Sequence, residues 1–421
     1  MRLVRLECEG YRGLSKVSIN FDKRLTVLVG TNGSGKSSIL DALTVLLSQY
    51  SARLASSPSS AGRLKDTDVR LGASETTLRL KAFDDRVGPV AWALRKQGQR
   101  ERVLRPTGSD LTGLNSFIKA IAADQSDGLD YLRGETLPIY YDQSRSVIRI
   151  PKRRRDKTND TALATFQDGI SSWGIDFRKL TYWFQDRETD ELRRQKARSR
   201  YVDHQLEAVR QAITKATGLK TPFFNVDAPR GITVMKGRTP LHISQLSTGE
   251  QVLMALGADL ARRLSNIAAD RDRPLSGSAI VLIDEVELHL HPKWQRHFIP
   301  WLLSTFPKCQ FVLTTHSPQV LGSVHASCVR VLASSARGTK VQRTSAVFGR
   351  DSNHLLRSVF DSDERRAKTH KLIEDADRAI TVGDYSKAQA LLEAMRDEIE
   401  GSPPEVAVLR ARLNRRTRTP L

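Results

Sequence analysis

The sequence has few cysteines and no long apolar run. Its three cysteines, Cys8, Cys309 and Cys328, lie far apart and show no paired ligand spacing. This pattern argues against a zinc module and favours a reducing compartment, with the three thiols in the core. No stretch approaches the about 20 apolar residues that a membrane helix needs, and the first residues, MRLVRLECEG, carry charges where a signal peptide is apolar. We therefore expect a cytoplasmic protein without a membrane segment.

Acidic residues are scarce relative to basic ones. Lys and Arg number 67 against 47 Asp and Glu, which gives a net charge of +20. Such an excess favours polyanionic partners, DNA among them, although a solvated basic surface gives the same count. The 421 residues, 39% of them hydrophobic, have the composition of an ordinary globular protein and suffice for two or three lobes.

The order of apolar patterns predicts an α/β fold. Short β-rich runs at 2–8, 16–21 and 25–29 predict strands, and the glycine-rich GTNGSGKSS after the third leads into a helical pattern. Further strands are predicted at 77–81, 90–94, 137–141, 279–284 and 310–314. The charged stretch from Asp176 to Thr217 lacks Gly and Pro and predicts helix, with an apolar stripe at Val202, Leu206, Val209 and Ile213.

These patterns divide the chain into four parts. We predict an N-terminal β-rich lobe at 1–150, a helical insertion at 151–225, a C-terminal α/β lobe at 226–345 and a helical segment at 346–421. In the last segment two helices are expected to pack as a hairpin through their apolar residues, which are Leu372, Ile373, Ala376 and Ile380 on one helix and Ala388, Leu391, Leu392, Met395 and Ile399 on the other.

The loop from Gly30 to Ser37 matches the phosphate-binding pattern G-x-x-x-x-G-K-[ST], between a predicted strand and a predicted helix. Its backbone N–H groups would wrap the phosphates of ATP, Lys36 would reach the β- and γ-phosphates, and the Ser37 hydroxyl would contact Mg²⁺. The residues expected to contact the nucleotide here are Gly30, Asn32, Gly33, Ser34, Gly35, Lys36, Ser37 and Ser38.

The run AIVLIDE ends in two carboxylates. A continuous apolar strand of this kind is typical of a buried parallel strand that delivers acids to a phosphate site. Asp284 would hold Mg²⁺, and Glu285 would orient and deprotonate the attacking water. The loop and the acid pair together predict an ATPase.

Lys36 and Asp284 are far apart in the chain, and LSTGEQ closely precedes the acidic strand. In this the sequence resembles the ABC-type ATPases of the SMC/RecF group, which implies that Ser247, Gly249 and Glu250 complete the nucleotide site of a second copy in a dimer. The same resemblance implies that His316 senses the γ-phosphate and that Gln143 contacts Mg²⁺.

Each of these assignments has a structural alternative. Ser247 and Glu250 also fit a helix capping box, a lone histidine at a strand end is often structural, and any polar turn residue could occupy position 143. His289 and His291 in LHLHP look like a metal pair, but no third ligand is evident. They fall where the resemblance places a loop at the dimer interface.

A closer resemblance is carried by a string of motifs: YYDQSRSV, SSWGIDFRKLTYWFQDRETDE, QLSTGEQ, IDEVELHLHPKWQR and FPKCQFVLTTHSPQVL. They resemble the AAA-type ATPase family of Septu and retron-Septu antiphage systems, which includes PtuA. The resemblance implies a head-to-tail dimer or a larger assembly that controls a separate HNH nuclease, PtuB. In retrons it also implies a reverse transcriptase with its DNA product. Asn353 and His354 lack the setting of an HNH nuclease, and no TOPRIM pattern is evident, unlike in the OLD nucleases.

Two other functions compete with this one. A RecF-like DNA-repair ATPase would account for the net charge and for the basic insertion, which includes Arg153, Arg154, Arg155, Arg193, Arg194 and Lys196. A transporter ATPase is disfavoured because the sequence shows no membrane segment.

Overall fold

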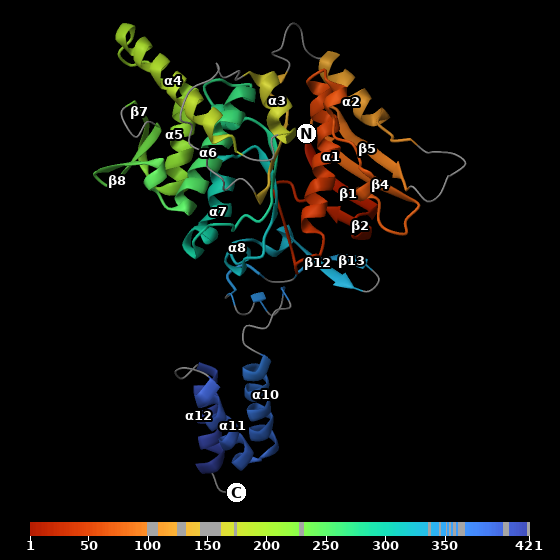
Figure 1. The fold of residues 1–421 in the computed structure, drawn as a ribbon, viewed down its shortest axis with the longest axis vertical. Coiled ribbons are helices and arrows are strands. Elements are labelled where there is room, and N and C mark those ends of the chain that lie inside the picture. The colour runs from red at the N-terminus through yellow and green to blue at the C-terminus, as the bar shows by residue number, and fades with distance from the viewer. Residues whose placement is uncertain are drawn as a thin grey trace. The chain divides into compact units, whose positions relative to one another are not determined.

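The computed structural model describes residues 1–98, 108–123, 132–143, 161–171, 175–226, 231–335, 338–344, 347–350, 352, 355–356, 359–360, 367–398 and 404–418. The chain forms two compact units, Met1–Asp351 and Ser352–Leu421 (Figure 1). The four-part division predicted from the sequence stays a prediction. Three residues of the predicted basic insertion, at 153–155, and the pair at 353–354 lie outside the described residues.

An antiparallel four-stranded sheet forms the N-terminal part of the first unit. Its order is β2-β1-β4-β5, with β1 at Arg2–Tyr11, β2 at Leu14–Asn20, β4 at Glu75–Asp84 and β5 at Gly88–Gln97. Buried and more accessible positions largely alternate along β4, as expected for a sheet with one face on the core. The strands predicted here from alternation are confirmed.

The second sheet has six strands in the order β13-β12-β3-β11-β10-β6. Its members are β3 at Leu25–Gly30, β6 at Leu137–Tyr141, β10 at Ala279–Ile283, β11 at Cys309–Thr314, β12 at Val329–Ser335 and β13 at Gly338–Gln342. The pairs from β12 through β6 are parallel, and β3, β6, β10 and β11 are buried at every position. This explains their continuous apolar runs, because parallel strands are covered on both faces.

Helix α1, Lys36–Leu54, contacts both sheets. Trp92 of β5 donates its indole N–H to the Leu46 carbonyl of α1 at 3.0 Å. In Figure 1, α1, α2 (Thr112–Ala123) and the antiparallel sheet lie on one side of this unit. The other side holds α4 (Phe177–Ala197), α5 (His204–Thr217), α6 (Thr248–Ile267) and α7 (Pro292–Thr305). Because β3, β11 and β10 pair in parallel, their carboxyl ends lie at one edge of the sheet, where the loop between β3 and α1 begins.

The helical stretch predicted before residue 217 consists of α4, Phe177–Ala197, and α5, His204–Thr217, preceded by α3 at Ala162–Ser171. Leu206, Val209 and Ile213 are buried on α5, as predicted. Val202 is a wrong prediction: it precedes the N-cap residue Asp203, outside the helix, and is 45% exposed.

The remaining elements of the first unit surround these helices. Helix α6 spans Thr248–Ile267, α7 spans Pro292–Thr305, and α8 spans Pro318–Leu321. A three-stranded antiparallel sheet comprises β7 at Lys220–Asn225, β8 at Gly231–Lys236 and β9 at Thr239–His242. Short 3-10 turns occur at Pro58–Ser60, Asp66–Asp68, Ile243–Gln245, Pro274–Ser276 and Ala326–Cys328.

Two of the three cysteines lie in the core. Burial raises the pKa of Cys8 and of Cys309 to about 12, so both are protonated thiols. The prediction of a core thiol is wrong for Cys328, which is only half-buried because it ends the 3-10 turn before β12.

The second unit contains α10 at Ala367–Val382, α11 at Tyr385–Glu398 and α12 at Pro404–Arg418. The predicted hairpin is confirmed, since Ala376 and Ile380 of α10 share one buried cluster with Leu392 of α11. Val406, Leu409 and Leu413 of α12 join the same cluster. The predicted hairpin is thus part of a three-helix arrangement; the predicted member at position 399 lies outside the described residues. In the described part of the chain, no helix combines the length and apolarity that crossing a membrane requires.

Candidate nucleotide site

The loop between β3 and α1 depends on glycine at two closely packed points. Gly30 has φ 153°, and a Cβ there would lie 2.4 Å from the Leu332 carbonyl oxygen. Gly35 caps α1 in the left-handed region with φ 98°, and a Cβ would lie 2.6 Å from the Leu14 side chain. Other residues are therefore strained or excluded at both positions. The loop brings its backbone to the N-terminus of α1, where N–H groups attract anions.

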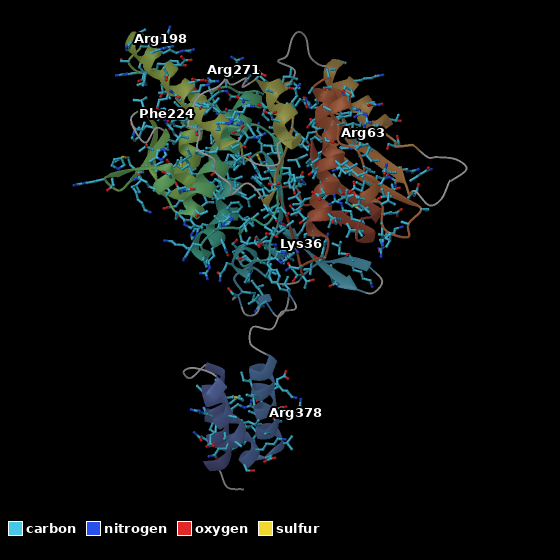
Figure 2. All side chains as sticks on the ribbon, viewed as in Figure 1. Lys36, Arg63, Arg198, Phe224, Arg271 and Arg378 are labelled. Carbon is cyan, nitrogen blue, oxygen red and sulfur yellow. The ribbon has the colours of Figure 1, made fainter. Side chains whose placement is uncertain are left out.

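Lys36 lies at the first position of α1 and is 6% exposed (Figure 2). Its Nζ donates to the carbonyl oxygens of Gly30 at 2.9 Å and Thr31 at 3.0 Å. Burial lowers the pKa of Lys36, although the carboxylates of Asp284 and Glu285 act in the opposite direction. The ammonium group thus faces both the loop and the acidic end of β10.

The structure brings the predicted magnesium ligands together. Ser37 Oγ donates to Asp284 Oδ2 at 3.0 Å, and Gln143 Nε2 lies 3.3 Å from the same oxygen. Gln143 Nε2 also donates to Glu285 Oε1 at 3.0 Å. Gln143 follows β6, the strand that pairs with β10, so parallel pairing places it beside the two acids.

Glu285 and Asp284 share a contact that the sequence reasoning missed. The Thr314 hydroxyl donates to Asp284 Oδ1 at 2.5 Å and accepts the Glu285 N–H at 2.7 Å. Glu285 itself has φ 47°, a left-handed conformation that is unusual for a non-glycine residue. One buried hydroxyl at the end of β11 therefore fixes both acids.

His316 also has a partner that the sequence reasoning missed. Glu287 accepts the His316 N–H at 2.5 Å and the Thr315 hydroxyl at 2.7 Å, which ties the end of β11 to the segment after β10. Burial and the charge of Lys36 lower the pKa of His316, so its imidazole is neutral at neutral pH. In the sequence, Glu287 lies two residues after Glu285 in DEVE, and this spacing is the signal that could have pointed to it.

Comparison with known families is consistent with this geometry. A family model described as "AAA domain" matches residues 5–221, more than half of the chain. The chain belongs to the AAA-domain family. A second family model, described as "AAA domain, putative AbiEii toxin, Type IV TA system", matches residues 143–322.

Two curated relatives of the AAA protein carry the predicted resemblance. The chain is 26% identical to "Retron Ec83 probable ATPase" of Escherichia coli, over 93% of this chain and 82% of the relative. It is 22% identical to "Septu protein PtuA" of Bacillus thuringiensis, over 75% of this chain and 72% of the relative. The predicted similarity to Septu and retron ATPases is confirmed.

A solved structure shows the same fold. The structure of an SmcHead bound to the C-winged helix domain of ScpA matches with a TM-score of 0.50 and 18% identity, over 82% of this chain and 98% of that chain. The AAA protein therefore has the α/β fold of an SMC-type P-loop ATPase head, as its motifs predict.

The motif LSTGEQ of the AAA protein forms the start of α6. Ser247 Oγ accepts the Glu250 N–H at 3.4 Å, and Glu250 Oε2 accepts the Ser247 N–H at 3.0 Å, which is a capping box. Although burial alone would raise the pKa of Glu250, its contacts with Lys236, at 2.9 Å, and with Ser247 lower it. A Cβ on Gly249 would lie 3.0 Å from the His289 carbonyl oxygen.

The other predicted residues make no described hydrogen bond with the acid pair of Asp284 and Glu285. Among the described hydrogen bonds and ion pairs, none links Ser247, Gly249 or Glu250 to the phosphate loop. Asn32 is exposed in the loop, and Ser38 is half-buried in the first turn of α1.

The two histidines of LHLHP, His289 and His291, have structural roles in a turn and in a helix cap. His289 adopts a left-handed conformation with φ 63°, and His291 Nδ1 accepts the Lys293 N–H at 3.3 Å as the cap of α7. Among the described residues, no three or more histidine, cysteine or acidic side chains are grouped so that they could hold a metal ion.

A buried ionic cluster includes Tyr141, which lies two residues before Gln143 in the chain. Tyr141, at the end of β6, donates its hydroxyl to Asp259 Oδ2 at 2.9 Å. Asp259 also accepts from Arg262 at 3.1 Å and from Arg263 at 2.7 Å, and all three side chains are at most 5% exposed. The cluster joins α6, which begins with Ser247, to the strand that leads to Gln143.

Proposed function

We propose that this protein binds and hydrolyses ATP with Mg²⁺ as the regulatory subunit of an antiphage defence complex in the cytoplasm. The observation that carries the ATPase part is the 3.0 Å contact between Ser37 Oγ and Asp284 Oδ2. It joins a phosphate loop to an acidic strand end from the opposite part of the chain, which is the arrangement that nucleotide hydrolysis requires.

The donor set fits magnesium. The Ser37 hydroxyl and the Asp284 carboxylate would supply oxygen ligands, and Gln143, whose amide nitrogen contacts both acids, is the third proposed ligand. Mg²⁺ would neutralise charge on the β- and γ-phosphates. Lys36 would bind the same phosphates, and the loop residues Gly30, Asn32, Gly33, Ser34, Gly35 and Ser38 would surround them.

Glu285 is the proposed general base. The Thr314 hydroxyl and the Gln143 amide hold its backbone and carboxylate, so an attacking water could be oriented by Oε2 and lose its proton there. His316, neutral and anchored through Glu287, would hydrogen-bond the γ-phosphate.

The second half of the site would come from another copy of the chain. The N-terminus of α6 carries the positive end of a helix dipole, and Ser247, Gly249 and Glu250 make no described hydrogen bond to the phosphate loop of their own chain. In a head-to-tail dimer this end would face the γ-phosphate held by the other copy.

ATP-dependent dimerisation would control a separate HNH nuclease similar to PtuB. Support comes from the similarity to a Septu PtuA and to a retron ATPase over most of the chain. A reverse transcriptase with its DNA product is the further partner that the retron relative suggests.

Glu285→Gln tests the base and the partner together. We expect this variant to bind ATP and to hydrolyse it roughly 10²- to 10⁴-fold more slowly, because the amide cannot accept the proton. Tagged Glu285→Gln should capture an HNH nuclease from its native host in the presence of ATP, as identified by mass spectrometry. Lys36→Ala is the control, since it should lose ATP and the nuclease. Unchanged turnover would assign the base elsewhere, and capture of DNA alone would contradict nuclease control.

A mixing experiment tests the composite site. Ser247→Arg should bind ATP without hydrolysing it, and Lys36→Ala should do neither. When the two are mixed, the Lys36→Ala copy still offers an intact Ser247 to ATP bound by the other copy, so activity should return. A mixture as inactive as its components would refute a site shared between copies.

A further inference from the structure

A cavity lies apart from the nucleotide site and shares no lining residue with it. It has a volume of ≈ 480 Å³ and is lined by the first turn of α3, the first turn of α5, and residues at and beyond the end of α6. Figure 2 shows Arg271 of this cavity toward the upper edge of the view, whereas Lys36, at the start of α1, lies well below it. Cavities of about 300–1,000 Å³ are typical of small-ligand sites.

The lining is cationic. Arg133, Arg187 and Arg271 come from three different segments and reach the same cavity, which we call the arginine pocket. Asp203 is the one carboxylate among its described lining residues. That carboxylate is engaged, because it pairs with Arg187 at 3.2 Å and caps α5 by accepting the Gln205 N–H at 3.0 Å.

Arg271 supplies the uncompensated charge. Its side chain is exposed, and none of the described hydrogen bonds or ion pairs involves it. Outside the lining, Asp272 lies 3.7 Å from His204, where both side chains are largely exposed and screened by water. Guanidinium groups bind phosphate through paired N–H donors, and the N-termini of α3 and α5 add to the positive field.

The pocket also contains an aromatic ring and continues into a basic surface. Tyr201 lines it and accepts from Arg194 at 2.9 Å, with the Arg194 guanidinium 5.2 Å from the ring centroid. The adjoining end of α4 and the residues after it carry exposed basic side chains at Arg193, Lys196, Arg198 and Arg200. Figure 2 shows Arg198 at this end of α4.

We propose that the arginine pocket binds one nucleotide of a single-stranded nucleic acid. Its phosphate contacts Arg271 and Arg133, its base stacks on Tyr201, and the neighbouring phosphates follow the basic end of α4. Cationic grooves with an aromatic platform bind single strands in this way. The site is separate from the phosphate loop, and the proposal does not depend on control of a nuclease.

The test is fluorescence anisotropy of a labelled oligothymidylate of about ten nucleotides, a length within the range of single-strand sites. We expect Arg271→Ala to weaken binding about tenfold and to reduce the salt slope by about one. Arg273→Ala is the matched control. It removes the same charge two residues away, from an exposed side chain outside the pocket, and should change affinity less than about twofold.

Two further arms sharpen the result. Tyr201→Phe should keep the affinity that Tyr201→Ala loses, because only the ring is required for stacking. The measurements are repeated in the Lys36→Ala background, which removes binding at the phosphate loop. Equal affinities of wild type, Arg271→Ala and Arg273→Ala would overturn the proposal. Binding of thymidine monophosphate that depends on Arg271, without binding of the strand, would also overturn it and assign the pocket to a free nucleotide.

Discussion

At the scale of single residues, Thr314 holds Asp284 and Glu285 in place. Its hydroxyl is at once a donor to Asp284 and an acceptor for the Glu285 backbone, at the end of a strand where the side chain is fully buried. Ser37 occupies the other oxygen of Asp284. One small, fully buried side chain therefore holds both the proposed metal ligand and the backbone of the proposed base.

Thr314→Val removes this hydroxyl at nearly constant shape. We expect a loss of about 1–3 kcal/mol in unfolding free energy, because a buried carboxylate oxygen and a buried N–H lose their partner. ATP turnover should fall more than ATP affinity, as measured by hydrolysis and equilibrium binding. Thr314→Ser, which keeps a hydroxyl at this position, is the matched control and should retain most of the turnover. Equal turnover in wild type and Thr314→Val would show that Thr314 does not position Glu285.

The sequence predicted residues whose motif carries chemistry by itself and missed those that support them. Lys36, Ser37 and Asp284 belong to patterns with fixed spacing, and the structure brings them together. Thr314 and Glu287 follow no such pattern, because their roles arise from the parallel pairing of β10 with β11. The local spacing of apolar residues does not show which distant strands pair with one another.

At the scale of elements, α6 is joined to β6 by the buried cluster around Asp259. Burial alone would raise the pKa of Asp259, but Arg263 and Arg262 more than offset it and the pKa is lowered. The carboxylate is therefore ionised and compensates two buried guanidinium groups. The cluster links the helix that begins at Ser247 to the strand that ends near Gln143.

Asp259→Asn should be strongly destabilising. The substitution removes a buried ionised partner of two arginines, and breaking a buried ion pair typically costs about 3–5 kcal/mol. Tyr141→Phe, which removes only one hydrogen bond of the cluster, should cost about 1 kcal/mol. Urea unfolding of the two variants checks this difference. A loss for Asp259→Asn no larger than that for Tyr141→Phe would show that the charge is compensated in another way.

Elements with one dominant pattern were predicted best. Strands β3, β6, β10 and β11 are buried throughout, and their continuous apolar runs gave their positions. The predicted apolar stripe of α5 includes Val202, which has helical spacing but precedes the N-cap residue Asp203 and so lies outside the helix. Spacing alone does not show where an Asp begins a helix.

At the scale of the whole molecule, the second unit has a core of its own. The cluster formed by α10, α11 and α12 consists of residues from these three helices, such as Ala388, Leu392 and Leu409. All residues of the proposed nucleotide site lie in the first unit. The three helices are thus not needed to build the phosphate loop or the acid pair.

Removal of the three helices tests this independence. A chain that ends at Phe360 retains the whole of the first unit and should bind ATP within about twofold of the full chain, a difference of less than about 0.5 kcal/mol in binding free energy. Isothermal titration calorimetry measures the affinity, with Lys36→Ala in the shortened chain as the control. A soluble shortened chain that no longer binds ATP would contradict the prediction.

The strand order of the six-stranded sheet also determines when the site can form during synthesis. The antiparallel sheet is complete once residue 97 has been made, but Thr26 of β3 pairs with Val312 and Val27 pairs with Val329. At about 5–20 residues per second, β3 would wait roughly 15–60 s on the ribosome for its first neighbour. During this interval an apolar strand has unpaired edges, which favours aggregation or chaperone binding. A nascent chain therefore completes the proposed nucleotide site only after residue 314 has been translated.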